Sequence, residues 1–160
     1  MLSDKHIAHK TCLGKIGIMG HSLGGLGALI AGSEDTRIKC IVGLAPAILP
    51  EVFTVPKEIY SISIPTQLQI GSNDGIIPPE NIKGFFNKLN TKHRNYVHIE
   101  GGNHIRFLNK NLVSLIGEYL SRLGIMGIHL KDQRANITFE EQHVLSSKRF
   151  LEWFDNFLKH

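Results

Sequence analysis

The chain has 160 residues, which is the length of one domain. Hydrophobic residues make up 42% of it and charged residues 20%, so the composition excludes a disordered chain of low hydrophobicity and high net charge. The formal net charge is +4, and the basic residues are scattered rather than gathered in a stripe with aromatic residues, which argues against nucleic acid as a partner.

Short apolar runs alternate with helical patterns along most of the chain, which predicts an α/β domain with a mostly parallel sheet. The sheet is expected to have about four strands flanked by helices. The predicted strands are Lys15–Met19, Ile38–Leu44, Thr66–Ile70 and Asn95–Ile99. The helices predicted between and after them are Leu23–Ala31, Glu80–Leu89 and Leu112–Leu123. The first of these helices is rich in glycine and alanine, and we expect it to lie close against the sheet.

A terminal helix is predicted to begin after Thr138. Thr138 and Glu141 have the spacing of a capping box, in which each side chain binds the main-chain N–H of the other residue. Apolar and small residues then recur every three or four positions, which predicts one helix face packed on the sheet. That stripe consists of Val144, Ser147, Leu151, Phe154 and Leu158.

The first motif that carries chemistry is Gly-His-Ser-Leu-Gly at residues 20–24, which fits G-x-S-x-G. It lies where an apolar strand stops and a helix starts, which is the setting that this motif requires. A tight turn there would strain Ser22 and project its Oγ clear of the sheet. The flanking glycines would avoid collisions with the neighbouring strand and helix. The N–H of Leu23, at the helix N-terminus, is then the candidate donor to an oxyanion.

A serine becomes a good nucleophile only when a base takes its proton, and a carboxylate commonly orients that base. His104 follows the fourth predicted strand, and Asp74 follows the third. Because parallel strands end at one edge of a sheet, Ser22, Asp74 and His104 are expected to converge there. Glu100 is the alternative carboxylate, although its place before Gly101 suggests that it ends the strand.

These motifs, in this order, resemble those of the α/β-hydrolase family, and most of all its dienelactone-hydrolase-like and lipase or esterase branches. The resemblance rests on residues 20–25, residues 70–74 with the prolines at 78 and 79, and residues 102–104. It implies a carboxylic ester hydrolase that acts on a small-molecule ester without a cofactor. Ser22 would be the nucleophile, His104 the general base and acid, and Asp74 the orienting carboxylate. An acyltransferase would use the same residues.

The sequence departs from that family at its start. The family's full domain has about eight strands and its serine follows the fifth, whereas only fourteen residues precede the first predicted strand here. We therefore expect one partial domain over residues 1–160, with a remnant leader at 1–14, strands and catalytic loops at 15–104, and a C-terminal loop and helices at 105–160. The loop that supplies a second oxyanion N–H would be missing.

Two consequences of this departure remain open. The strand Lys15–Met19 would become an exposed apolar edge, at which a second copy of the chain or a complementing chain could pair. The alternative function is accordingly an inactive or partner-dependent part of a hydrolase. The substrate-binding residues cannot be named from the sequence.

The remaining features are interpreted as structural rather than functional. Two cysteines, Cys12 and Cys40, define neither a disulfide framework nor a zinc site and are expected to be small buried residues. The uncharged stretch 16–33 contains His21, Ser22 and six glycines, so neither a signal peptide nor a membrane span is predicted, and the default location is the cytoplasm. His21 is expected to be a packing or hydrogen-bonding neighbour of Ser22, and His98 is expected to be a strand side chain. No metal is expected, because the other histidines lack ligand spacing and are assigned to the surface: His6, His9, His129 and His143.

Overall fold

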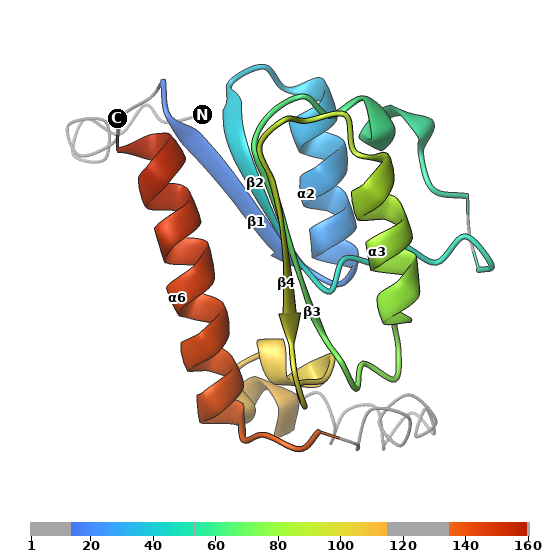
Figure 1. Cartoon of the computed structure of the whole chain (residues 1–160), viewed down its shortest axis with the longest axis vertical. Coiled ribbons are helices and arrows are strands. Elements are labelled where there is room, and N and C mark those ends of the chain that lie inside the picture. The colour runs from blue at the N-terminus through green and yellow to red at the C-terminus, as the bar shows by residue number, and fades with distance from the viewer. Residues whose placement is uncertain (1–13, 53, 115–134, 160) are drawn as a thin grey trace.

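Four parallel strands form the sheet, and their order in space is their order along the chain. The computed structural model describes residues 14–52, 54–114 and 135–159. The strands are β1 (Ile16–His21), β2 (Ile38–Leu44), β3 (Thr66–Gly71) and β4 (Arg94–Ile99). Each strand pairs in parallel with the next, so all four carboxyl ends lie at the same edge of the sheet (Figure 1). The predicted fold class and the four predicted strands are confirmed.

Helices cover both faces of this sheet. Helices α2 (Leu23–Glu34) and α3 (Pro79–Lys88) lie on one face, and the long helix α6 (Phe139–Leu158) lies on the other (Figure 1). Short 3₁₀ turns, η1 (Lys57–Ser61) and η2 (Ile105–Phe107), complete the described elements. The central strands are accordingly almost wholly apolar or buried, because a strand that is covered on both faces has no solvent side.

The larger hydrophobic core lies between the sheet and the pair α2 and α3. It includes Leu29 of α2, Ile41 and Ile70 of the sheet, and Ile82 and Phe85 of α3, all of which are buried. A smaller core lies on the α6 side. The sheet is thus held between two apolar layers, which fixes the edge at which its strands end.

Helix α2 packs closely on the sheet through only some of its small residues. A Cβ at Gly32 would lie 2.2 Å from Cδ1 of Ile41, so the helix lies close against this β2 side chain. Gly24 and Gly27 are exposed, and no described atom lies within 4 Å of a Cβ placed at either. The expectation that the small residues pack on the sheet is therefore right for one face of the helix and wrong for Gly24 and Gly27.

Helix α6 begins as the sequence predicts but turns a partly different face to the sheet. The Glu141 N–H donates to Thr138 Oγ1 at 3.1 Å, and the Thr138 N–H donates to Glu141 Oε2 at 2.6 Å, which confirms the capping box. The predicted apolar stripe is only partly right. Val144 is 65% exposed and Leu151 is 55% exposed, whereas Phe154 packs against the core on the α6 side of the sheet.

The buried face of α6 is polar in its first half and apolar in its second half. Gln142, Ser146 and Trp153 are its buried residues. The sheet presents Gln69 to this helix, and Ser146 Oγ donates to Gln69 Oε1 at 2.6 Å while Gln69 Nε2 donates to the Ser146 carbonyl at 3.2 Å. Gln67 Nε2 similarly donates to a carbonyl of α6 at 3.2 Å. Matched hydrogen bonds let polar groups be buried here, so hydrophobic periodicity alone selects the wrong face.

Several predictions fall partly outside the described residues. Residues 110–114 are helical, whereas 115–134, which contain the rest of the predicted helix Leu112–Leu123, lie outside the description. Cys40 is buried as expected, and burial raises the pKa of its thiol to about 11. Cys12 and the proposed leader are outside the described part. The division of the chain at 14 and 104 stays a prediction.

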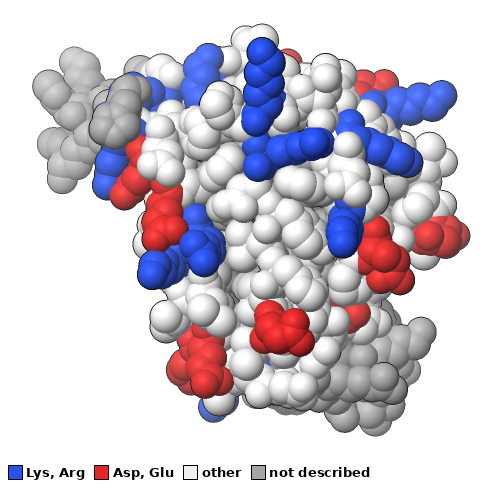
Figure 2. Space-filling view, viewed as in Figure 1, with Lys and Arg blue, Asp and Glu red and all other residues white. Residues whose placement is uncertain are grey.

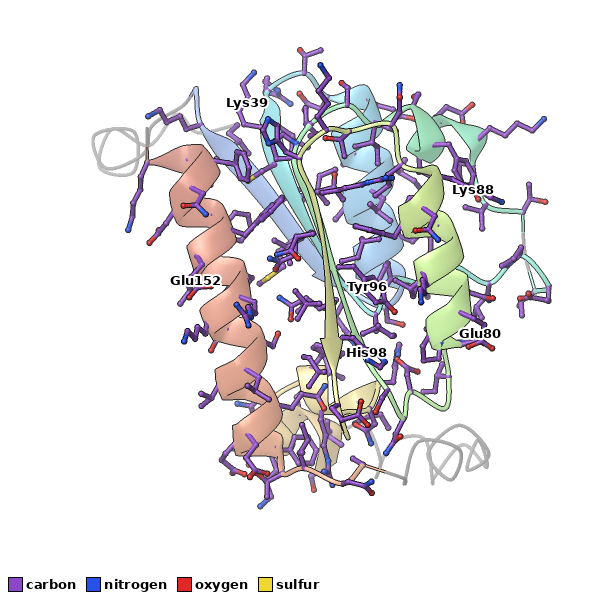
Figure 3. All side chains as sticks on the ribbon, viewed as in Figure 1. Lys39, Glu80, Lys88, Tyr96, His98 and Glu152 are labelled. Carbon is purple, nitrogen blue, oxygen red and sulfur yellow. The ribbon has the colours of Figure 1, made fainter. Side chains whose placement is uncertain are left out.

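Basic side chains are unevenly distributed on the face of the molecule that Figure 2 shows. On the face shown in Figure 2, lysine and arginine side chains gather mainly in the upper half, where the strands begin. The labelled Lys39 and Lys88 lie at this end of the molecule (Figure 3). In the ranges that the structure describes, no helix is both long and apolar enough to cross a membrane.

Candidate active site

Ser22 is the one residue that links strand β1 to helix α2. Its backbone has φ 56° and ψ −121°, a conformation that is strained for any residue other than glycine. Three main-chain hydrogen bonds hold it: its N–H donates to the Leu44 carbonyl at 2.9 Å, and its carbonyl accepts from the N–H groups of Leu26 at 3.0 Å and Ala47 at 2.9 Å. The neighbouring loop and helix therefore fix the strained turn that the motif predicts.

The glycines around Ser22 are not equally required. A Cβ at Gly20 would lie 2.0 Å from the Gly24 carbonyl oxygen, and one at Gly25 would lie 2.9 Å from Cα of Pro46. The predicted collision is therefore confirmed for Gly20. It is wrong for Gly24, the second glycine of the motif, whose Cβ position is open in the described structure.

The three predicted side chains meet at the carboxyl edge of the sheet. Ser22 Oγ lies 3.0 Å from His104 Nε2, and His104 Nδ1 lies 2.9 Å from Asp74 Oδ2. The serine follows β1, the aspartate follows β3, and the histidine follows β4. Parallel pairing of the strands thus brings together groups that are 82 and 30 residues apart in the chain.

The carboxylate of Asp74 is completely buried, and both of its oxygens have hydrogen-bond partners. Its side chain is 0% exposed, and that of His104 is 5% exposed. Asp74 Oδ1 accepts hydrogen bonds from the N–H groups of Ile76 at 2.9 Å and Ile77 at 2.7 Å, which leaves Asp74 Oδ2 directed at the imidazole. The alternative carboxylate, Glu100, has an 88% exposed side chain and lies near His98 instead. The structure therefore places Asp74, and not Glu100, beside His104.

His21 contacts the opposite side of the His104 residue. Its Nε2 donates to the His104 carbonyl at 3.0 Å, and the two ring centroids are 4.6 Å apart. Burial lowers the pKa of His21 to about 4, and the positive charge that His104 can carry acts in the same direction. His21 is thus neutral near pH 7, with its proton on the nitrogen that binds the carbonyl. The expected hydrogen-bonding role of His21 is confirmed, but its described partner is the His104 carbonyl rather than Ser22.

The main chain before His104 is tied to the loop after β3 and to helix α6. The Gly101 N–H donates to Ser72 Oγ at 2.8 Å, and the Gly102 carbonyl accepts from the Asn73 N–H at 2.9 Å. The Asn103 peptide groups bind the buried side chain of Gln142 from α6. The sequence reasoning missed Ser72 and Gln142, because no motif marks a side chain that binds main-chain groups across the fold.

Leu23 occupies the first position of α2, directly after the serine. The first N–H groups of a helix have no acceptor within the helix, and the helix dipole places partial positive charge there. The first turn of α2 contains no acidic residue to offset that charge. The 70% exposed Leu23 side chain leaves this end of the helix at the surface, next to the serine. An anion forming at Ser22 would meet a favourable field.

Comparison with known proteins shows the family to which the chain belongs. Residues 2–151 match the family model described as PET hydrolase-like. The chain belongs to the PET hydrolase-like family. It is also 29% identical over 145 residues to the platelet-activating factor acetylhydrolase of the dog, a match that covers 87% of this chain and 32% of that protein.

Solved structures of a hydrolase and an esterase share the fold of this PET hydrolase-like chain. The putative dienelactone hydrolase of Klebsiella pneumoniae is similar over 94% of this chain and 56% of its own, with a TM-score of 0.63 and 17% identity. Pyrococcus furiosus esterase Pf2001 is similar over 68% of this chain and 53% of its own, with a TM-score of 0.53 and 24% identity. The PET hydrolase-like chain thus spans about a third of the curated relative and about half of the solved ones.

Two other histidines of the PET hydrolase-like chain, His98 and His143, contact groups outside the Ser22, His104 and Asp74 cluster. His98 is a β4 side chain, as expected, and its ring stacks on that of Tyr96 (Figure 3). His143 is half-buried rather than on the surface, because its Nε2 donates to the Leu108 carbonyl at 2.8 Å. The described ranges contain no group of three or more histidine, cysteine or acidic residues arranged to hold a metal ion. His6, His9 and His129 lie outside those ranges.

Proposed function

We propose that this PET hydrolase-like protein is a serine hydrolase that cleaves carboxylic esters through an acyl-serine intermediate. One observation carries the proposal: an unbroken chain of contacts runs from Ser22 Oγ to His104 Nε2 at 3.0 Å and from His104 Nδ1 to Asp74 Oδ2 at 2.9 Å. A nucleophile, a base and an orienting carboxylate in this geometry are the parts that acyl transfer needs.

In the first half of the reaction, Ser22 Oγ attacks the ester carbonyl carbon while His104 Nε2 accepts the hydroxyl proton. The imidazole becomes a cation, which the buried Asp74 carboxylate stabilises through the Nδ1–H. The carbonyl oxygen becomes an oxyanion, and the Leu23 N–H donates to it at the N-terminus of α2. His104 then gives its proton to the alcohol oxygen as the bond between that oxygen and the carbonyl carbon breaks.

In the second half, water replaces the alcohol. His104 removes a proton from the water as its oxygen attacks the acyl carbon, and then returns that proton to Ser22 Oγ as the acid leaves. All protein groups in this cycle come from the chain itself, and the proposed cycle uses neither a cofactor nor a metal. The relatives named as esterases and as an acetylhydrolase favour a small ester as the substrate class.

Hydrolysis of p-nitrophenyl acetate by the purified chain tests this proposal. Wild type is expected to release nitrophenol catalytically, and Ser22→Ala is expected to reduce the rate to the level of the buffer. Ser147→Ala removes a serine hydroxyl from the far helix α6 and should leave the rate unchanged. Equal rates for wild type and Ser22→Ala would reject the proposal.

A second candidate, partner-dependent hydrolysis, is favoured by the position of β1. Within the described residues this strand pairs only with β2, and its residue Met19 is 44% exposed. An open apolar edge favours pairing with another strand, from a second copy or from a complementing chain. The test is light scattering with activity over a range of protein concentrations. Specific activity that rises as dimers form would support this candidate, and a monomer of constant specific activity would contradict it.

A further inference from the structure

The side chain of Gln142 makes a pair of hydrogen bonds that the proposed chemistry has not used. It is 0% exposed, on the face of α6 that meets the end of the sheet. Its Oε1 accepts from the Asn103 N–H at 2.9 Å, and its Nε2 donates to the Asn103 carbonyl at 2.8 Å. One buried amide thus satisfies both main-chain groups of a single residue, as a neighbouring strand would.

This pair of bonds acts on the residue that precedes the base. The Asn103 carbonyl belongs to the peptide that joins Asn103 to His104, so its direction sets where the Cα of His104 lies. Gly102 is part of the same contact, since a Cβ there would lie 2.9 Å from Gln142 Oε1. The glycine before Asn103 in the third motif therefore has a packing reason, namely the close approach of this amide.

The other side of the His104 residue is held by His21, whose Nε2 binds the His104 carbonyl at 3.0 Å. The main chain of residues 103 and 104 is thus held from α6 on one side and from β1 on the other. One turn further along α6, Ser146 and Gln69 form a separate pair of hydrogen bonds between the helix and β3. Gln142 is the α6 side chain whose described hydrogen bonds reach the main chain before the base.

We propose that Gln142 is a positioning residue for His104. Its hydrogen bonds to Asn103 fix the position of the His104 imidazole relative to Ser22 Oγ and the Asp74 carboxylate. This inference rests on the proposed serine hydrolase function. Without the amide, the Asn103 N–H and carbonyl would each lose a buried hydrogen bond, and the loop would be expected to shift. A displacement of about 1 Å at a reacting group can reduce the rate about 10²-fold. Loss of the Gln142 amide is therefore expected to lower kcat and to leave KM nearly unchanged.

The kinetic test compares Gln142→Met, which keeps the size and removes both hydrogen bonds, with Gln142→Glu, which keeps an acceptor for the Asn103 N–H. We expect kcat for p-nitrophenyl acetate to fall about 10- to 100-fold in Gln142→Met with KM within about twofold, and to fall less in Gln142→Glu. If Gln142→Met does not fold, Gln142→Glu carries the test, and kcat equal to that of wild type would overturn the proposal.

The matched control is Ser146→Ala. It removes a buried hydrogen bond from the same face of α6, one turn away, without touching the His104 loop. Thermal unfolding should show that both variants lose stability, whereas kcat should stay within about twofold of wild type only in Ser146→Ala. Equal losses of kcat in Ser146→Ala and Gln142→Met would show a merely structural role and would overturn the proposal.

A second measurement keeps this inference separate from the proposed function. The Nδ1 proton of His104, held between the imidazole and Asp74, is expected to give a downfield proton resonance in NMR spectra. This signal should persist in Ser146→Ala and be lost or shifted upfield in Gln142→Met. An unchanged signal in Gln142→Met would overturn the positioning role. The comparison holds even for a wild-type chain that hydrolyses no ester, a result that would reject the proposed function instead.

Discussion

The imidazole of His104 lies between the completely buried carboxylate of Asp74 and the hydroxyl of Ser22, which follows strand β1. Its Nδ1 lies 2.9 Å from Asp74 Oδ2, while its Nε2 lies 3.0 Å from Ser22 Oγ. Two main-chain N–H groups occupy the other carboxylate oxygen, so only one oxygen faces the ring. The burial and these bonds hold the imidazole in the tautomer that presents an unprotonated Nε2 to the serine.

Asp74→Asn should therefore lower kcat strongly without unfolding the protein. The amide has the shape of the carboxylate but can present an N–H to Nδ1, which favours the wrong tautomer and removes the charge that stabilises the imidazolium. A loss of about 10³- to 10⁴-fold in kcat is expected. Steady-state hydrolysis of p-nitrophenyl acetate measures it. Asp155→Asn, on the half-exposed side of α6, is the control and should hydrolyse the ester as wild type does.

Stability should depend on pH through His21. The pKa of this group is lowered from 6.5 to about 4 by burial, with His104 adding to the effect. Between these two values the unfolded chain binds more protons than the folded one, so the free energy of unfolding falls as the pH falls. The expected slope is up to about 1.4 kcal/mol per pH unit, and the full stability is present above pH 6.5.

His21→Gln isolates this contribution, because its amide can still donate to the His104 carbonyl but does not titrate. Urea unfolding at several pH values from 7 to 4 should show a shallower decline for the variant than for wild type. Parallel curves for the two proteins would contradict the assigned environment of His21.

The sequence predicts the strands and the three reacting side chains because each is marked locally. An apolar run buried on both faces, such as Ile38–Leu44, has only one plausible structure, and β2 has the same bounds. Ser22 is marked by its motif and by the strand before it. Parallel topology then forces the groups that follow β3 and β4 to the same edge, so their convergence follows from the strand order.

The buried polar contacts are beyond sequence reasoning for a physical reason. Gln142 and Ser146 are buried because Asn103 and Gln69, which are distant in the chain, offer matching donors and acceptors. A glutamine in a helix is ordinarily assigned to solvent. Neither residue type nor periodicity reports such partners, so the stripe that contains Leu151 was predicted to be buried in place of the polar face.

The glycines of the serine turn should respond very differently to alanine. Gly20→Ala places a Cβ 2.0 Å from a main-chain oxygen and should destabilise the fold by several kcal/mol or prevent folding. Gly24→Ala and Gly27→Ala meet open space within helix α2 and should each stabilise it by about 0.5–1 kcal/mol. Denaturant unfolding of the three variants checks this, and a tolerated Gly20→Ala would be inconsistent with the described turn.

The orientation of α6 predicts which of its apolar residues matter for stability. Trp153 is 9% exposed and packs on β2, so Trp153→Ala should reduce the free energy of unfolding by about 3–5 kcal/mol. Leu151 is 55% exposed, so Leu151→Ala should change it by no more than about 0.5 kcal/mol. Thermal or urea unfolding distinguishes the two, and the reverse order would mean that the helix turns its other face to the sheet.

Covalent labelling tests the central claim, that His104 and Asp74 make Ser22 nucleophilic. A fluorophosphonate reacts with an activated serine and stays bound, so intact-mass analysis and peptide mapping locate the adduct. The account predicts one adduct on Ser22 in wild type, slower labelling in Asp74→Asn and no adduct in Ser22→Ala. An unlabelled wild-type chain, or a Ser22→Ala variant labelled as fast as wild type, would contradict it.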